Sequence, residues 1–224
     1  MNDALRALVA MCAAVGARNR AAMAITMDQA AENADAEQAE EALLQSYLFV
    51  GYPIALQALS MWRERTGRVA PEKATPKDPP STWRKRGEAI CEQVYAGQYS
   101  KLRKNISRLH PDMERWMLEE GYGKVLSRSQ LDLKVRELCI IGVLVGLDAP
   151  QQLYSHLRGA LNVGATPEEV ELTVDIACGQ SSLTAKDNAR KVWRDLKAKR
   201  SEQERNEAAG EQAGSRDLEQ GGTT

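Results

Sequence analysis

The chain has 224 residues, of which 43% are hydrophobic, and a formal net charge of −1. A chain of this size can bury a substantial core, and its near-neutral charge gives no electrostatic reason to expect binding to nucleic acid or to a membrane surface. One Phe, few runs of β-branched residues and abundant Ala, Leu, Glu, Lys, Arg and Gln predict an all-α protein.

The cysteines are widely separated along the chain. They form neither a Cys-x-x-Cys pair nor a spacing typical of zinc sites, so we expect no metal site and a reduced, cytoplasmic chain. The apolar start resembles a short signal peptide, but Asp3 accompanies Arg6 in a segment that is usually positive, which disfavours secretion. The four cysteines are Cys12, Cys91, Cys139 and Cys178.

The first third of the chain predicts four helices separated by short breaks. Asp35 is expected to cap the third helix, and the segment from Gly51 to Pro53 is expected to separate the third helix from the fourth. Residues 66–82 are rich in Pro and in charged residues, which predicts a linker. The expected helices span residues 3–15, 18–32, 36–50 and 53–65.

After the linker, short helices are expected as far as residue 122, with breaks at Gly87 and Gly97. His110 opens the last of these helices, where we expect it to be solvated. Tyr95 and Tyr99 are one helical turn apart, so they are candidates for the mouth of a pocket.

The stretch from Leu131 to Glu171 predicts two helices joined by a tight turn and followed by a third helix. Its apolar run, residues 138–147, is too short to span a bilayer. Gly146 is expected to end the first helix, and Asp148 to cap the start of the second. A capping box then begins the third helix at Thr166.

This helical hairpin brings one acid and one histidine together. Residues equidistant from the turn of an antiparallel helix pair lie at similar heights, so Glu137 and His156 are expected to face each other. A carboxylate beside an imidazole fixes the tautomer of the ring, and such a pair can shuttle protons. The same pair can equally be a satisfied polar contact that holds two core helices together, and the spacing alone leaves both interpretations open.

The first third of the chain weakly repeats this central stretch. At an offset of 130, residues 5–8 align with residues 135–138, and Gly16 aligns with Gly146. After one inserted residue, an offset of 131 aligns Trp62 with Trp193. We infer an internal duplication of a four-helix unit.

The first copy lacks the acid and the histidine. Ala7 stands at the position of Glu137, and Thr26 stands at the position of His156. Residues 1–65 are therefore predicted to form a degenerate repeat that completes the core, while the second copy holds any site.

The second copy is predicted to form a domain over residues 83–200. Its last helix is expected to end near Lys199. Residues 201–224 are rich in Gly, Glu, Gln and Ser and have almost no large apolar side chain, which predicts a disordered tail.

Five short segments resemble one known family when taken together. They are Arg136-Glu137-Leu138, Gln152-Leu153, His156-x-Arg158-Gly159-Ala160, the segment from Gly164 to Glu169, and the segment from Phe49 to Pro53. Together they resemble the carboxymuconolactone decarboxylase family, which is part of the AhpD-like superfamily. The resemblance covers residues 83–195 well and residues 5–63 as a weaker first repeat.

This resemblance implies an AhpD-like, all-α bundle of repeated helical hairpins that binds a small-molecule substrate without a cofactor. It also implies a homo-oligomer, either a trimer or a hexamer. In the peroxidase branch of the superfamily, a Glu and a His relay protons beside a Cys-x-x-Cys pair. Glu137 and His156 match that relay, but Ala149 and Gln152 stand at the two cysteine positions, which disfavours a peroxiredoxin-type activity because it needs a reactive thiolate.

The resemblance therefore favours a carbon–carbon lyase that uses cofactor-free acid–base chemistry. We expect Glu137 and His156 to be its catalytic residues in decarboxylation of, or proton transfer on, a small lactone or carboxylic acid. Arg136 and Arg158 are candidates to bind a substrate carboxylate, although Arg158 lies about 200° from His156 on an ideal helix. The alternatives are alkylhydroperoxidase activity and a non-catalytic oligomeric binding protein.

Overall fold

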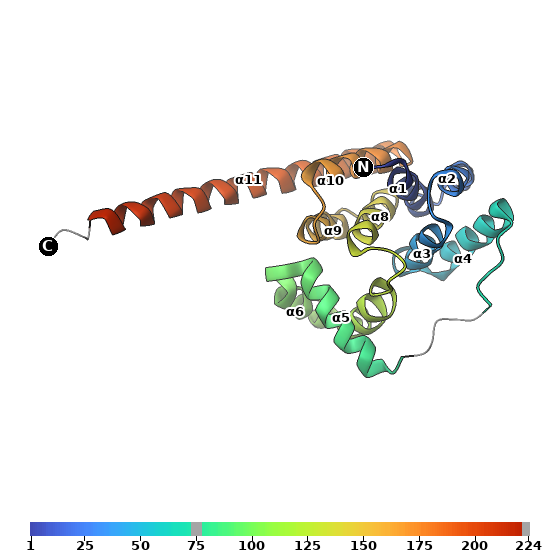
Figure 1. The fold of residues 1–224 in the computed structure, drawn as a ribbon, viewed down its shortest axis with the longest axis horizontal. Coiled ribbons are helices and arrows are strands. Elements are labelled where there is room, and N and C mark those ends of the chain that lie inside the picture. Colours follow the sequence, from blue (N-terminus) through green and yellow to red (C-terminus); the bar gives the residue numbers. More distant parts are fainter. Residues whose placement is uncertain (73–77, 221–224) are drawn as a thin grey trace.

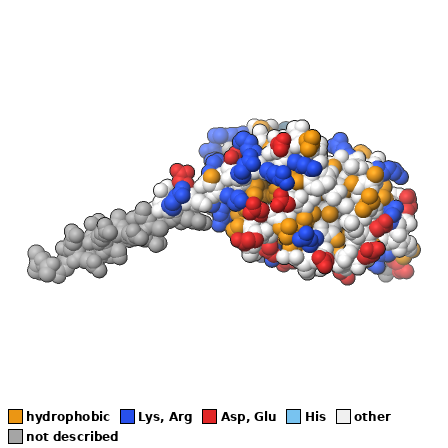
Figure 2. Space-filling view, turned by 90° about the horizontal axis from the view of Figure 1, so that it is seen from above, with side chains coloured by type: hydrophobic (Ala, Val, Ile, Leu, Met, Phe, Trp, Pro, Cys, Tyr) orange, Lys and Arg blue, Asp and Glu red, His pale blue; other side chains and the backbone are white. Residues whose placement is uncertain are grey.

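The computed structural model describes residues 1–72 and 78–220 (Figure 1). Within these ranges every regular element is a helix, so the expected all-α class is confirmed. Most of the helices form one body, and the last helix extends away from it (Figure 1). On the face seen in Figure 2, acidic, basic and apolar side chains are interspersed.

The first third of the chain forms four helices. Asp35 caps α3 as expected, because its carboxylate accepts hydrogen bonds from two backbone N–H groups at the start of that helix. Gly51 bends α4 with φ of 74°, a conformation that favours glycine. Helix α3 ends at Gln45 and not at residue 50 as expected, and α4 begins at Tyr47 and not at residue 53. The four elements are α1 (Asp3–Gly16), α2 (Arg20–Asn33), α3 (Ala36–Gln45) and α4 (Tyr47–Thr66).

The middle of the chain forms short helices around a wide π-helical turn. Gly87 was expected to break a helix but lies inside α5. A glycine is needed there because a Cβ atom would overlap the carbonyl oxygen of Leu118. His110 does open a helix and is exposed, and its Nδ1 accepts a hydrogen bond from Asp112 N at 3.1 Å. The elements are α5 (Pro80–Tyr95), η1 (Ala96–Gln98), α6 (Tyr99–Leu109), α7 (Pro111–Trp116) and η2 (Met117–Leu126).

The last part of the chain contains the expected helical hairpin, formed by α8 (Leu133–Gly146) and α9 (Pro150–Asn162). The predicted cap at Asp148 is wrong, because this residue has a positive φ of 56° and Ala149 occupies the N-cap position. The predicted capping box at the start of α10 (Pro167–Gly179) is present.

The final helix, α11 (Leu183–Gln220), is longer than expected. Sequence analysis placed its end near Lys199 and a disordered tail after it, whereas the structure continues the helix to Gln220. Ala, Glu, Gln and Arg favour a helix even where no apolar face exists to pack. Residues 221–224 of the expected tail lie outside the described residues. The expected linker, residues 66–82, is only partly described, because residues 73–77 lie outside the described ranges and its last three residues already belong to α5.

Helices α1 and α8 pack against each other at the centre of the body. A Cβ atom on Gly16 would overlap the carbonyl oxygen of Val143, and one on Gly146 would overlap that of Ala13, so the two backbones are in direct contact. Helix α8 contributes to two hydrophobic cores on opposite sides, with Leu138 in one and Cys139 in the other. This explains why its sequence is apolar on nearly all faces.

The beginnings of the two copies correspond at the expected offset. Helices α1 and α8 each have 14 residues. The turns that follow them contain residues of positive φ at equivalent places, Arg18 with 54° and Asp148 with 56°. This correspondence supports the inferred duplication, which stays a prediction.

Over the described ranges, no helix by itself has the length and apolar character needed to cross a bilayer. Only α3 and α4 taken together meet that test by length and composition, and the two are bent by 115°.

Candidate functional site

The hairpin brings Glu137 and His156 into contact as the sequence predicted. The Oε2 atom of Glu137 lies 2.8 Å from Nδ1 of His156. Glu137 is fully buried and His156 is 6% exposed. When Glu137 is ionised, its carboxylate can only accept hydrogen bonds, so Nδ1 of the ring then donates. The second ring nitrogen, Nε2, is thereby left as the atom that can exchange a proton with a ligand.

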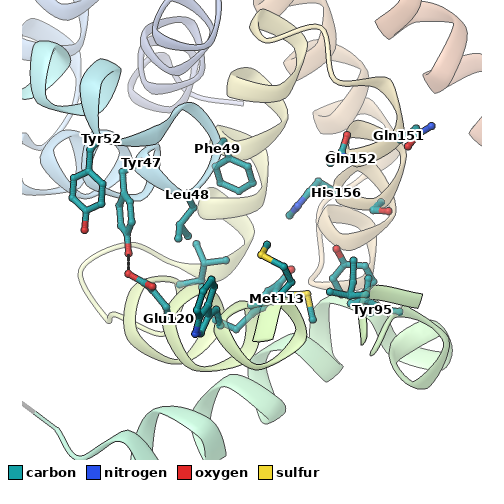
Figure 3. A pocket seen from close by; sticks show the side chains of 18 residues that line it. Tyr47, Leu48, Phe49, Tyr52, Tyr95, Met113, Glu120, Gln151, Gln152 and His156 are labelled. Atoms are coloured by element: carbon teal, nitrogen blue, oxygen red, sulfur yellow. Dashed lines mark hydrogen bonds between the residues drawn. The ribbon is translucent and has the colours of Figure 1, made fainter. Parts of the chain in front are cut away.

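His156 lies in the wall of a cavity of about 710 Å³ (Figure 3). Its floor and sides come from four parts of the chain that are far apart in sequence: the start of α4, the end of α5, the helices from α6 to η2, and α9. Most lining side chains are aromatic or aliphatic. A mostly apolar cavity with a few polar groups is the usual form of a small-molecule site.

The first third of the chain also contributes to this cavity, a contribution that the sequence did not predict. Tyr47, Leu48, Phe49 and Tyr52 line it from the start of α4. The ring of Phe49 packs edge-on against that of His156, with centroids 5.6 Å apart and an interplanar angle of 83°. The expectation that the second copy alone holds the site is therefore corrected. The segment from Phe49 to Pro53 belongs to the family resemblance and was the available signal.

Two tyrosines whose rings pack against each other line the cavity. Tyr95 lines it as expected, together with Tyr122, whose ring packs edge-on against that of Tyr95 with centroids 6.2 Å apart. Burial raises the pKa of both hydroxyls, so they remain neutral and can donate hydrogen bonds. Tyr99, the other candidate, is not among the described lining residues.

A second polar contact lies on the side of the cavity away from His156 (Figure 3). The hydroxyl of Tyr47 donates to Oε1 of Glu120 at 2.9 Å. Burial and then the neighbouring carboxylate raise the pKa of Tyr47, so this hydroxyl also stays protonated. Glu120 belongs to η2, a π-helix, and wide helical turns of this kind are frequent at functional sites.

Arg136, a candidate for binding a carboxylate, is used inside the protein instead. It is fully buried, and its guanidinium donates to Glu41 at 3.0 Å and to Gln45 at 3.1 Å. It also donates to the backbone oxygens of Leu131 and Arg128. Although Arg136 is adjacent to Glu137 on α8, it is not among the described residues that line the cavity.

Arg158, the other candidate, is half-buried and does not line the cavity. Among the described lining residues none is Lys or Arg, so the described wall itself carries no permanent positive charge. The ionisable groups in its wall are His156, Glu120 and the tyrosines.

The cysteines are placed outside the cavity wall as the structure describes it. Burial and then the Glu137 carboxylate raise the pKa of Cys91 to about 12, which keeps the thiol protonated. A hydrogen bond with Cys139, followed by burial, raises the pKa of Cys12, and burial raises that of Cys178. Within the described residues, no group of three His, Cys, Asp or Glu side chains is arranged to hold a metal ion.

Gly159 determines the space available to the Glu137 carboxylate. A Cβ atom on Gly159 would lie 2.8 Å from Oε2 of Glu137 and 2.6 Å from Cγ1 of Val94. We therefore expect Gly159→Ala to displace the carboxylate and to lower stability by about 1–3 kcal/mol. Nitrogen-15 NMR of the His156 imidazole detects the displacement of the carboxylate, because loss of the hydrogen bond between Nδ1 and Oε2 of Glu137 leaves the ring in a mixture of tautomers.

Gly179→Ala is the matched control, since a Cβ atom there would have no neighbour within 4 Å. An unchanged imidazole spectrum in Gly159→Ala would show that Glu137 does not depend on this glycine.

Comparison with known proteins identifies relatives of the region around this site. The model of the carboxymuconolactone decarboxylase family matches residues 111–195. The 4-carboxymuconolactone decarboxylase of Acinetobacter baylyi is 30% identical over 96 residues, which are 41% of this chain and 72% of that enzyme.

Two fungal proteins match more of the chain. Peroxisomal protein 2 of Schizosaccharomyces pombe is 34% identical over 142 residues, and its namesake in Saccharomyces cerevisiae is 27% identical over 164 residues. Each match covers 61% of this chain. The chain spans 65% of the first protein and 58% of the second, which is less than two thirds of either.

Proposed function

Because the chain belongs to the carboxymuconolactone decarboxylase family, we propose that its cavity carries out cofactor-free acid–base chemistry on a small lactone or carboxylic acid. His156 moves the proton and Glu137 orients the ring. The observation that carries this proposal is the 2.8 Å bond between these buried side chains at the wall of an open cavity.

In a decarboxylation, the bond between the carboxyl carbon and its neighbour breaks and carbon dioxide leaves. The electron pair stays on the substrate and is delocalised onto an adjacent carbonyl as an enolate. The imidazolium of His156 then delivers the Nε2 proton to the carbon, while the Glu137 carboxylate stabilises the positive ring. The neutral hydroxyl of Tyr95 is a suitable donor to the enolate oxygen.

The same pair can run a proton transfer without loss of carbon dioxide. Neutral Nε2 takes a proton from the carbon next to a carbonyl and returns it to another carbon. The family and the name of the Acinetobacter relative favour the decarboxylation.

A panel of lactones and carboxylic acids distinguishes these possibilities. We expect release of carbon dioxide from at least one of them, or incorporation of deuterium from heavy water, and loss of both in His156→Ala. Binding of panel members without either reaction would instead support a non-catalytic binding protein.

Cysteine chemistry is not part of the proposal, because the thiols are protonated or lie away from the cavity. We expect replacement of all four cysteines by Ala to leave turnover within about twofold of wild type, since no thiolate attacks the substrate. Circular dichroism checks that the variant is folded, because three of the four side chains are fully buried. A loss of peroxide reduction in this variant, with wild-type activity towards peroxide, would support the alkylhydroperoxidase alternative.

The trimer or hexamer and the cytoplasmic location expected from the sequence remain proposals. Analytical ultracentrifugation of the full chain tests the first of them.

A further inference from the structure

We infer that the substrate has a single acidic or carbonyl head, bound at His156, and a long apolar body that lies against the helices from α6 to η2. This inference rests on the proposed function and specifies its substrate: a carboxylic acid or lactone that carries one long apolar chain, and not a compact dicarboxylic one.

The first support is the composition of the wall that faces His156. The apolar side chains of α6, α7 and the start of η2 turn towards the cavity, and none of the wall residues from α6 or α7 is charged. Two of them remain half-exposed, Met113 at 50% and Trp116 at 51%. Large apolar side chains left open to water at a cavity mouth are typical of a surface that a ligand covers. The wall residues are Leu102, Ile106, Met113, Trp116 and Met117.

The second support is the distribution of charge. A substrate with one carboxylate can place it at Nε2 of His156 when that nitrogen carries a proton, but a second carboxylate at the other side would meet Glu120 (Figure 3). Glu120 already accepts from Tyr47 at 2.9 Å and lies 3.8 Å from the ammonium group of Lys124. Arg136, fully bonded inside the protein, cannot turn towards the cavity to neutralise a second charge. Burying an unpaired carboxylate is strongly unfavourable.

The third support is size. The cavity of about 710 Å³ lies in the upper part of the range of roughly 300–1,000 Å³ found for drug-sized ligands. A small dicarboxylic lactone placed at His156 would leave much of the apolar wall wet, whereas an extended apolar body covers it and releases that water.

Isothermal titration calorimetry with the full chain tests the inference without depending on turnover. The probes are butanoic, hexanoic and octanoic acids, and octanedioic acid as the dicarboxylate of equal length to octanoic acid. We expect affinity to rise by about two- to fourfold for each added methylene group that the wall covers. We expect octanoic acid to bind at least about tenfold more tightly than octanedioic acid.

Matched variants locate the binding surface. Ile106 lines the cavity, whereas Leu109 on the same helix is 79% exposed and does not. We expect Ile106→Gln to weaken octanoic acid binding about fivefold and Leu109→Gln to change it by less than about twofold. Met113→Lys adds the missing cation and is expected to improve octanedioic acid binding about fivefold.

Affinity that does not depend on chain length, or tighter binding of octanedioic acid by the wild type, would overturn the inference. So would dissociation of an oligomer by Ile106→Gln with unchanged ligand affinity, because the wall would then be a contact between copies of the chain. Unchanged turnover in His156→Ala would contradict the proposed function and not this inference, since the dependence on chain length is measured by binding.

Discussion

Replacing Glu137 by Gln is expected to lower turnover by about 10²- to 10⁴-fold, the usual contribution of an acid–base group. The amide oxygen that Glu137→Gln introduces can still accept a hydrogen bond from Nδ1 of His156, so the ring keeps its place. The imidazolium formed during the reaction, however, loses the negative charge that stabilises it.

The same replacement is expected to leave the free energy of unfolding unchanged or higher. One carboxylate oxygen of Glu137, Oε1, is buried without a hydrogen-bond partner among the described residues, and a neutral amide in that place is less costly to desolvate than a carboxylate. Thermal denaturation and turnover of the same preparation give both quantities. A strongly destabilised Glu137→Gln with normal turnover would show that the pair serves to hold α8 and α9 together.

Replacing Arg136 by Met is expected to lower the free energy of unfolding by about 3–5 kcal/mol, because it leaves Glu41 with an incompletely compensated buried charge. Urea denaturation measures this cost. Arg63→Met is the matched control, because the pair of Arg63 and Glu40 is partly exposed and is expected to contribute about 1 kcal/mol or less. Unchanged stability with lost substrate binding in Arg136→Met would restore the role in carboxylate binding that the sequence suggested.

Low pH is expected to weaken the contact of Glu41 with Arg136. Burial opposes ionisation of Glu41, but hydrogen bonds from Arg128 and Arg136 outweigh it and hold the pKa below the ordinary value of 4.5. The folded state therefore binds this proton less readily than the unfolded state does. The contribution of ionised Glu41 to the free energy of unfolding is complete above pH 4.5 and is lost as the pH falls towards the lowered pKa. Glu41→Gln removes this contribution. The free energy of unfolding of the variant, measured by urea denaturation, should therefore fall less steeply with decreasing pH than that of wild type.

The sequence was informative wherever the determining interactions are local. Helix caps such as Asp35, the capping box of α10 and the two helices on either side of Asp148 depend on residues within one or two turns, and all were predicted. The contact between Glu137 and His156 is also nearly local, because a tight turn fixes the relative height of two antiparallel helices. Asp148 itself was assigned the wrong role, since its positive φ reflects the geometry of that turn.

The tertiary structure decided which residues surround the pair. Arg136 neighbours Glu137 in sequence, yet its carboxylate partner Glu41 is 95 residues away, and no local pattern shows that the guanidinium is committed there. Gly87 was expected to break a helix, but close approach to η2 is what requires a glycine at that position.

The sequence by itself therefore determined the all-α class, several helix ends and the contact between Glu137 and His156, because turns, caps and periodicity act over a few residues. Only the packed structure decided the cavity. Its walls join the start of α4, the π-helical turn and α9, which are brought together by burial of apolar surface between segments distant in sequence. Such burial is non-directional, so the chain order of apolar residues does not show which of them will meet around His156.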